Sequence, residues 1–248
     1  MVFTIGSMRE MRQQRTGVRD AARLAALPGV RTGARRRTHA AVCTTVAQYA
    51  ALCGWSVVPG TRAARGGGAC SCGDPGCRVP GAHPLPLAEE IPAGTPRDQA
   101  AKAWARVPGA SVLLPVGHSF DVLDVAEASG HRALARLERM GLRLGPVLLT
   151  PAGRAQFFVA PGAAAELPHL LYRTGWDDAL LDLRCLGPGD HVTAPPSDHA
   201  GLGPVRWLRE PLRDAVSRPL PQPGSHPPEA RLLLGTLAYV CHRDRVHL

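Results

Sequence analysis

The alternation of hydrophobic and polar residues predicts helices and short strands from about residue 38 onwards. A first helix is expected between Thr38, which can cap its start, and Gly54, which can end it. The apolar residues of this helix recur at helical spacing: Val42, Val46, Tyr49, Ala50 and Cys53. A short strand over Trp55–Val58 is expected next, and then a helix over residues 95–106 with proline in its first turn.

Short apolar runs bounded by glycine or proline predict a strand-rich centre. The expected strands are Ser111–Val116, Phe120–Val125, Val147–Thr150, Ala155–Ala160, Leu180–Arg184, Asp190–Ala194 and Val205–Leu208. Further helices are expected over Glu127–Met140, Leu167–Arg173 and Glu229–Cys241. The elements show no regular βαβ rhythm, so the sequence predicts an α+β fold with a mainly antiparallel central sheet flanked by helices.

The domain organisation follows from this pattern. Residues 1–37 contain few bulky apolar groups, and we expect a basic, disordered arm with some helix around Val18–Leu27. Residues 38–212 form the main domain, which includes a Gly/Pro/Cys-rich loop at 66–84. A Pro-rich linker is expected at 213–228, followed by a C-terminal helix at 229–248.

The net charge of +9 is confined to the front quarter of the chain. Residues 1–65 contain eleven arginines against Glu10 and Asp20, whereas residues 66–248 contain 18 basic and 18 acidic residues. A basic arm can attract phosphate backbones; a solvated extension, or a true start at Met8 or Met11, accounts for it equally well. The sequence contains no apolar run of membrane-spanning length, so we expect a soluble protein without a membrane partner.

The stretch CSCGDPGCRVPGAHP contains a candidate metal site. Three thiols and one imidazole fall within fourteen positions, broken by glycines and prolines that let the loop turn back on itself: Cys70, Cys72, Cys77 and His83. Such a Cys3His set is typical of tetrahedral Zn²⁺. Because the protein fills all four positions, the zinc is expected to be structural rather than catalytic.

Disulfides or free thiols are the alternatives to a metal site for these cysteines. Cys70 and Cys72 are too close to bridge easily, and the total of seven cysteines leaves one unpaired. The sequence also has no secretory signal. Unpaired thiols and a zinc site favour a reducing cytoplasm.

The order of these pieces over residues 40–210 resembles the bifunctional DNA primase/polymerase (prim-pol) domain of the archaeo-eukaryotic primase superfamily. The resemblance depends on several segments taken together: Tyr49–Trp55, the CSCGDPGC…PGAHP loop, the helix containing Trp104, Phe120–Val125, Gly153-Arg154 before Phe157-Phe158, Leu181–Arg184, and Ala194–Ser197 before Trp207. The resemblance implies a primase/polymerase-like fold, and DNA and nucleotides as partners.

The resemblance also implies metal-assisted phosphoryl transfer. In active members, clustered carboxylates hold Mg²⁺ or Mn²⁺, which align the 3′-hydroxyl with the α-phosphate. Asp124 matches the first acid and Asp182 the third, and Glu127 is a further carboxylate beside the first strand acid. Arg154 matches a position in the nucleotide-binding turn, and Ser197 matches a loop that borders the nucleotide cleft.

The chain departs from the family pattern at three functional positions. Ala126 stands where the second acid is expected, Ala155 where the nucleotide-binding histidine is expected, and Ala82 where a lysine precedes the histidine of the cysteine loop. Asp121 is three residues from Asp124 and should point to the opposite face of a regular strand.

Two hypotheses of function follow, with a weaker third. The first is a DNA primase/polymerase that uses Mg²⁺ or Mn²⁺ at Asp124, Asp182 and Glu127. The second is a non-catalytic, zinc-stapled module on the same fold that binds a nucleotide, nucleic acid or a protein partner. The third is a zinc-knuckle regulatory protein that shares only the scaffold. If the second holds, Arg184 can neutralise Asp182 as a same-face neighbour on one strand.

Two further groups of residues have simpler interpretations. The run Ser197-Asp198-His199 contains the residue types of a hydrolytic triad, but consecutive residues cannot adopt triad geometry. The tryptophans are expected to anchor the core rather than to stack on bases: Trp55, Trp176 and Trp207.

Overall fold

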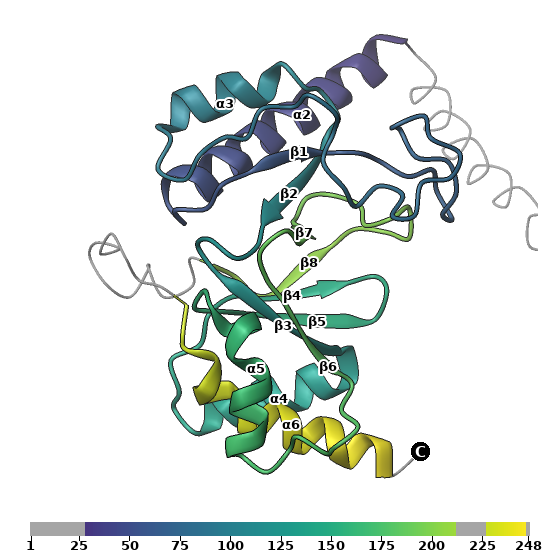
Figure 1. Cartoon of the computed structure of the whole chain (residues 1–248). Coiled ribbons are helices and arrows are strands. Elements are labelled where there is room, and N and C mark those ends of the chain that lie inside the picture. The colour runs from purple at the N-terminus through teal and green to yellow at the C-terminus, as the bar shows by residue number, and fades with distance from the viewer. Residues whose placement is uncertain (1–27, 212–226, 247–248) are drawn as a thin grey trace, which may run out of the picture. The chain divides into compact units, whose positions relative to one another are not determined.

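The computed structural model describes residues 28–211 and 227–246 (Figure 1). The chain divides into two compact units, residues 1–42 and 43–248. Among the described residues, the first unit contains the beginning of helix α2, which runs Pro28–Ala51. The predicted helix around Val18–Leu27 and most of the predicted Pro-rich linker lie outside the described residues.

The start of α2 corrects one expectation. The helix begins at Pro28, so Thr38 lies inside it and does not cap its start. Proline fits the first position of a helix because its missing N–H has no helical partner there. The arginines and alanine at residues 34–37 are good helix formers, and no proline interrupts the stretch up to Thr38.

The second unit contains two antiparallel sheets. The smaller sheet has the order β1-β2-β7, formed by Val58–Gly60, Ser111–Pro115 and His191–Thr193. The larger has the order β6-β3-β5-β4-β8, formed by Leu183–Leu186, Asp121–Ala126, Arg154–Val159, Val147–Thr150 and Arg206–Arg209. The expected α+β class with antiparallel sheets is therefore confirmed. The strand predicted at Trp55–Val58 begins later, at Val58.

Helices α4 (Glu127–Arg139), α5 (Ala163–Arg173) and α6 (Ala230–Val246) gather on one face of the five-stranded sheet (Figure 1). A fourth helix of this unit, α3, spans Arg97–Ala105. Alternate residues of β3 and β5 point into the core beneath the three helices: Leu123, Val125, Ala155, Phe157 and Val159. Leu137 of α4 and Leu233 and Leu237 of α6 meet them there. The helices thus cover one sheet face, and the other face carries both apolar residues such as Phe158 and the polar residues Asp124, Gln156 and Arg154.

Asp121 lies on the helix-covered face, as the alternation predicts. Its side chain is fully buried, and its Oδ2 accepts a hydrogen bond from the Ala164 N–H at 2.8 Å. Ala164 lies in the first turn of α5, where backbone N–H groups have no helical partner and favour a negative charge. Asp121 therefore anchors α5 rather than joining Asp124.

Gly130 allows α4 to approach the sheet closely. A Cβ atom added there would overlap the Cβ of Ala155 on β5. Gly130→Ala is therefore expected to lower the free energy of unfolding by about 1–3 kcal/mol through overpacking. Urea denaturation measures this change.

The matched control is Gly235→Ala on α6, where an added Cβ would meet no atom within 4 Å. This change should stabilise the protein by up to about 1 kcal/mol, because alanine has the higher helix propensity. Equal effects of the two substitutions would contradict the proposed close contact between α4 and β5.

An aromatic cluster packs on the other side of the larger sheet. Trp55, Phe120 and Phe158 pack with ring centroids 4.4–5.3 Å apart, and Trp207 lies 5.6 Å from Phe158. Tyr49 donates a hydrogen bond to the Pro195 carbonyl at 2.9 Å. Trp55 thus anchors the core, as expected. No helix in the described part of the chain is both long and apolar enough to cross a membrane.

Candidate functional site

Asp124 lies on the face of the five-stranded sheet that the helices leave uncovered. Its neighbours on β3, Leu123 and Val125, point into the helix-covered core, so Asp124 points the other way. Its cross-strand partners are Gln156 on β5 and Arg184 on β6, and directly paired residues share a sheet face. Three polar side chains from adjacent strands therefore meet here.

The Asp124 carboxylate is fully buried and is held by several donors. Its Oδ1 accepts from Arg154 Nε at 2.7 Å and from Arg184 Nε at 3.2 Å. Its Oδ2 accepts from Gln156 Nε2 at 2.9 Å. A buried charge requires such partners, because desolvation strongly disfavours an isolated carboxylate.

Arg154 joins Asp124 to Asp182. Its Nη1 donates to both oxygens of Asp182, at 2.9 and 2.7 Å, while its Nε donates to Asp124. Partial burial of Arg154 lowers the pKa of its guanidinium, but the hydrogen bonds that it donates to Asp182 and Asp124 outweigh burial and raise this pKa above the usual value. One guanidinium therefore lies between the two acids.

The strand register explains why Arg154 reaches this position. Arg154 pairs with Ala126 across β5 and β3, two residues beyond the Gln156–Asp124 pair and on the same face. Because residue 126 is alanine, no carboxylate stands beneath the guanidinium. The position expected for the second acid is thus spanned by the side chain of Arg154.

Two expectations about Asp182 and Arg184 are corrected. Asp182 precedes β6 rather than lying inside an apolar strand, and its side chain is 52% exposed. Arg184 forms its ion pair with Asp124 rather than with Asp182. Both differences have one cause: β6 begins at Leu183, which leaves Asp182 at the strand end, within reach of Arg154.

Glu127 interacts with residues other than those that contact the two aspartates. It is the first residue of α4, and its Oε1 accepts from Arg206 Nη2 at 3.2 Å and lies 3.5 Å from His131 Nε2. Within the described ranges, the only group of three or more His, Cys, Asp or Glu ligand atoms within 4.8 Å of one another is the cysteine–histidine group of the loop. Asp124, Asp182 and Glu127 do not form such a group.

Ser197 lies in the loop that follows a cis Pro195-Pro196 bond. Its side chain is buried, and its Oγ accepts the Val112 N–H at 2.7 Å, which ties the loop to β2. Nearby, His199 Nδ1 lies 2.9 Å from Thr193 Oγ1. Burial lowers the pKa of His199, although Asp198 and Asp124 oppose this shift.

Sequence reasoning missed Gln156 and His199 as members of this site. Gln156 lies two residues after Arg154 on the same strand. Because residues two apart share a sheet face, the position of Arg154 could have predicted that Gln156 joins the site. His199 belongs to the loop after β7, which the resemblance places beside the nucleotide cleft, but no local pattern of the sequence marks His199 itself.

The loop after β1 brings together the predicted metal ligands Cys70, Cys72, Cys77 and His83, whose ligand atoms all lie within 4.8 Å of one another. His83 Nε2 is 3.4 Å from the sulfurs of both Cys70 and Cys77. The other ring nitrogen, Nδ1, lies 2.9 Å from the Pro84 carbonyl. Donation from Nδ1 leaves the Nε2 lone pair for a metal, as in many histidine ligand sites.

The electrostatics of Cys70 also favour metal binding. Burial raises its pKa, but hydrogen bonds involving Cys72, Thr61 and the Gly81 N–H outweigh burial and lower it to about 5. The thiolate is the metal-binding form of cysteine. Three sulfurs and one imidazole therefore make a group that can bind a metal such as zinc, and this donor set fits a closed tetrahedral Zn²⁺ site.

Antiparallel sheets in one unit with a Cys3His loop are features that the resemblance implies. The family model described as bifunctional DNA primase/polymerase, N-terminal, matches residues 46–228. Because this match covers more than half of the 248 residues, the chain belongs to the bifunctional DNA primase/polymerase N-terminal domain family. No curated protein and no solved structure matches the chain.

Proposed function

We propose that this chain is a non-catalytic member of its family, a zinc-stapled module that binds a nucleotide or nucleic acid on the open face of the larger sheet. The observation that carries the proposal is the Arg154 guanidinium, which lies between Asp124 and Asp182 and donates to both. The side chains that would hold catalytic ions are instead paired with a cation supplied by the chain.

The donors and acceptors present do not fit a pair of catalytic Mg²⁺ or Mn²⁺ ions. Such ions need carboxylate oxygens that are free to coordinate them, and they align the reacting oxygens of an in-line displacement. Both oxygens of Asp124 and both of Asp182 accept hydrogen bonds, and Glu127 is paired with Arg206. Ala126 and Ala155 supply neither the second acid nor the phosphate-contacting histidine.

These losses are large on the scale of catalysis. A transition-state contact of this kind is typically worth about 2–4 kcal/mol. Removing one metal ligand and one phosphate contact together should therefore cost on the order of three or more decades in rate. Templated polymerisation is not expected from such a site at a useful rate.

The same side chains favour binding. The Arg184 side chain is 63% exposed, and its guanidinium can donate to phosphate oxygens from the edge of the sheet. Gln156 Oε1 is buried and has no hydrogen-bond partner among the described residues, so an unused acceptor lies beside Asp124. The proposed ligand is therefore a nucleotide, free or within a DNA strand.

Nucleotidyl transfer is the second candidate function, and one observation favours it. Asp124 and Asp182 converge on a single guanidinium, so a different Arg154 rotamer would leave two carboxylates facing one space. In that arrangement, Asp124 and Asp182 would hold Mg²⁺ or Mn²⁺, with Glu127 as a further acid and Arg154 and Ser197 beside the nucleotide.

Primer extension in Mn²⁺ with dNTPs separates the two candidates. We expect no extension by folded, zinc-loaded protein, together with binding of dNTP measured by calorimetry. Extension that disappears in Asp182→Ala would overturn the proposal and establish a working polymerase.

Arg184→Ala tests the binding surface directly. Loss of one charge-assisted hydrogen bond should weaken dNTP binding about tenfold. The control is Arg139→Ala at the end of α4, on the helix-covered side of the sheet, which should leave the affinity unchanged. Equal weakening by both substitutions would mean that binding depends only on overall charge.

The proposal also includes a structural metal ion, a cell compartment and a role for the basic N-terminal residues. Zn²⁺ is the structural ion at the Cys3His group, and the compartment is a reducing cytoplasm, which is supported by the absence of a disulfide among the cysteines of the described residues. The arginine excess of residues 1–37 favours attraction to phosphate backbones, and a protein partner is compatible with either function.

A further inference from the structure

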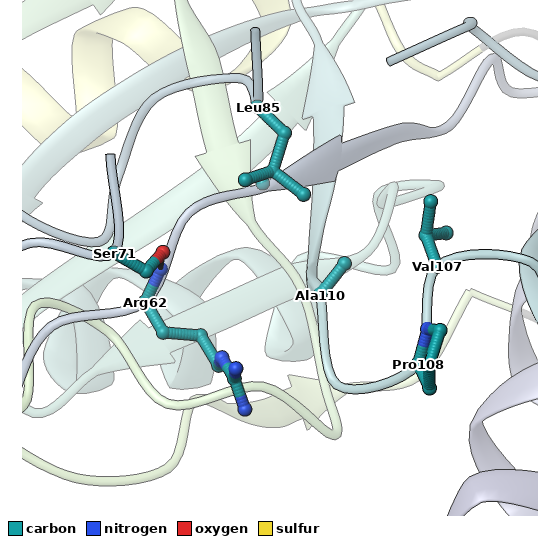
Figure 2. A pocket seen from close by; sticks show the side chains of 7 residues that line it. Arg62, Ser71, Leu85, Val107, Pro108 and Ala110 are labelled. Atoms are coloured by element: carbon teal, nitrogen blue, oxygen red, sulfur yellow. Dashed lines mark hydrogen bonds between the residues drawn. The ribbon is translucent and has the colours of Figure 1, made fainter. Parts of the chain in front are cut away.

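A separate hollow of about 260 Å³ lies beside the metal loop. It is lined from three stretches of chain: the segment after β1, the metal loop with the residues that follow it, and the loop between α3 and β2. Six of its side chains are labelled in Figure 2: Arg62, Ser71, Leu85, Val107, Pro108 and Ala110. None of them belongs to the Asp124 site.

The polar wall of this hollow offers hydrogen-bond donors. Arg62 forms no ion pair with any acid in the described part of the chain. Its guanidinium extends toward the Pro108–Ala110 side, where a Cβ at Gly109 would lie 2.7 Å from Nη1 (Figure 2). Ser71 Oγ already accepts the Arg62 N–H at 2.9 Å, so its hydroxyl hydrogen is left to donate.

The rest of the hollow is apolar. Leu85, Val107, Pro108 and Ala110 present carbon surface on the other sides of the hollow from Arg62 and Ser71 (Figure 2). The volume lies just below the range of about 300–1,000 Å³ that is typical of drug-sized ligand pockets. The hollow therefore suits a molecule no larger than a mononucleotide rather than an extended one.

The charge of the surrounding segment favours an anion. Residues 61–84 contain three arginines and one acid, Asp74, whose Oδ1 already accepts the Gly76 N–H. A Zn²⁺ bound by three thiolates adds a charge of about −1, which leaves the segment with a positive excess. A guanidinium fork and a hydroxyl together match the several oxygens of a phosphate group.

We propose that this hollow binds a phosphate ester with a small organic body, with Arg62 and Ser71 on the phosphate and the aliphatic residues on the body. Two sources share this chemistry: a free mononucleotide-sized ester and one nucleotide of a DNA strand. This site is separate from the surface around Asp124, Arg154 and Arg184, here called the Asp124 surface. The proposal for the hollow does not depend on the function proposed for the Asp124 surface.

Calorimetry of the zinc-loaded full chain with dTMP tests the proposal. Arg62→Gln should weaken dTMP binding about tenfold, because it removes a charge-assisted contact. The matched control is Arg65→Gln, a second arginine of the same segment that does not line the hollow, and it should leave the affinity unchanged. Unchanged melting temperatures establish that both variants are folded.

Three outcomes would overturn the proposal: no Arg62-dependent binding of either dTMP or an oligodeoxynucleotide, equal weakening by Arg62→Gln and Arg65→Gln, or weakening by Arg184→Ala alone. The last outcome would place the ligand at the Asp124 surface and leave the function proposed there intact. Thymidine, inorganic phosphate and a short single-stranded oligodeoxynucleotide complete the series. Arg62-dependent binding of the oligonucleotide identifies a DNA strand as the source, and Arg62-dependent binding of dTMP alone identifies a free ester.

Discussion

Replacing Cys70 with serine is expected to remove the bound metal and to lower the melting temperature of the protein by about 10 °C. A structural zinc ion contributes its binding free energy to folding, because the unfolded chain has no formed site. Backbone hydrogen bonds and the Thr61 to His83 and Arg62 to Ser71 contacts also support the loop, but only the metal would bind all four ligand side chains at once. A loss of about 3–4 kcal/mol corresponds to this change in a protein of 150–250 residues. Atomic absorption and thermal denaturation measure metal content and stability.

Cys53→Ser is the matched control. Cys53 is a half-buried thiol whose pKa is raised to about 12 by burial, and it lies outside the metal group. We expect this variant to keep about one zinc ion per chain. The assignment of the metal site would be contradicted if Cys70→Ser kept its full zinc content. It would also be contradicted if Cys53→Ser and Cys70→Ser lost zinc equally.

Arg154→Ala is expected to lower the free energy of unfolding by about 3–5 kcal/mol. Removing one partner of a buried ion pair leaves an uncompensated charge in a poorly solvated place. Asp124 is fully buried and would keep only Arg184 and Gln156, while Asp182 would lose both of its contacts with Arg154. Urea denaturation of the zinc-loaded protein gives the value.

Arg206→Ala provides the comparison. Arg206 pairs with Glu127 at 3.2 Å, but its side chain is 69% exposed, and exposed ion pairs typically contribute about 0–1 kcal/mol. A change in stability below about 1 kcal/mol is therefore expected. If Arg154→Ala were equally mild, the guanidinium would not be the principal partner of Asp124.

Most elements of the fold could be predicted from local patterns. Val147–Thr150 forms β4 with both predicted bounds, and α4 begins at Glu127 as expected. These elements have clear signals, namely a short apolar run and an amphipathic repeat. The start of α2 was missed because the sequence of residues 28–37 lacks the apolar periodicity on which the prediction depended.

The metal loop was predictable for a different reason. Its ligands are close in sequence, and glycine and proline between them allow only compact turns. Gly81 illustrates the constraint: it has a φ of +73°, and a Cβ there would lie 2.6 Å from the Ala63 nitrogen. Sequence spacing alone therefore indicates that the four side chains converge.

The Asp124 surface could be predicted only in part. Alternation places Asp124 and Asp121 on opposite faces, which the structure confirms. The pairing of Arg154 with both acids depends on the register of β3 with β5 and on where β6 begins, and one sequence does not fix either. This is why Arg184 was assigned to the wrong aspartate.

The central claim is that Arg154 takes the place of a divalent cation between Asp124 and Asp182. Titration of the zinc-loaded protein with Mn²⁺, followed by electron paramagnetic resonance, tests it most directly. The account predicts that the unsubstituted protein and the Asp182→Ala variant lower the free Mn²⁺ signal to the same extent, because no Mn²⁺ site depends on Asp124 and Asp182. Binding of about one Mn²⁺ per chain that disappears in Asp182→Ala would contradict it and return the chain to the catalytic members of its family.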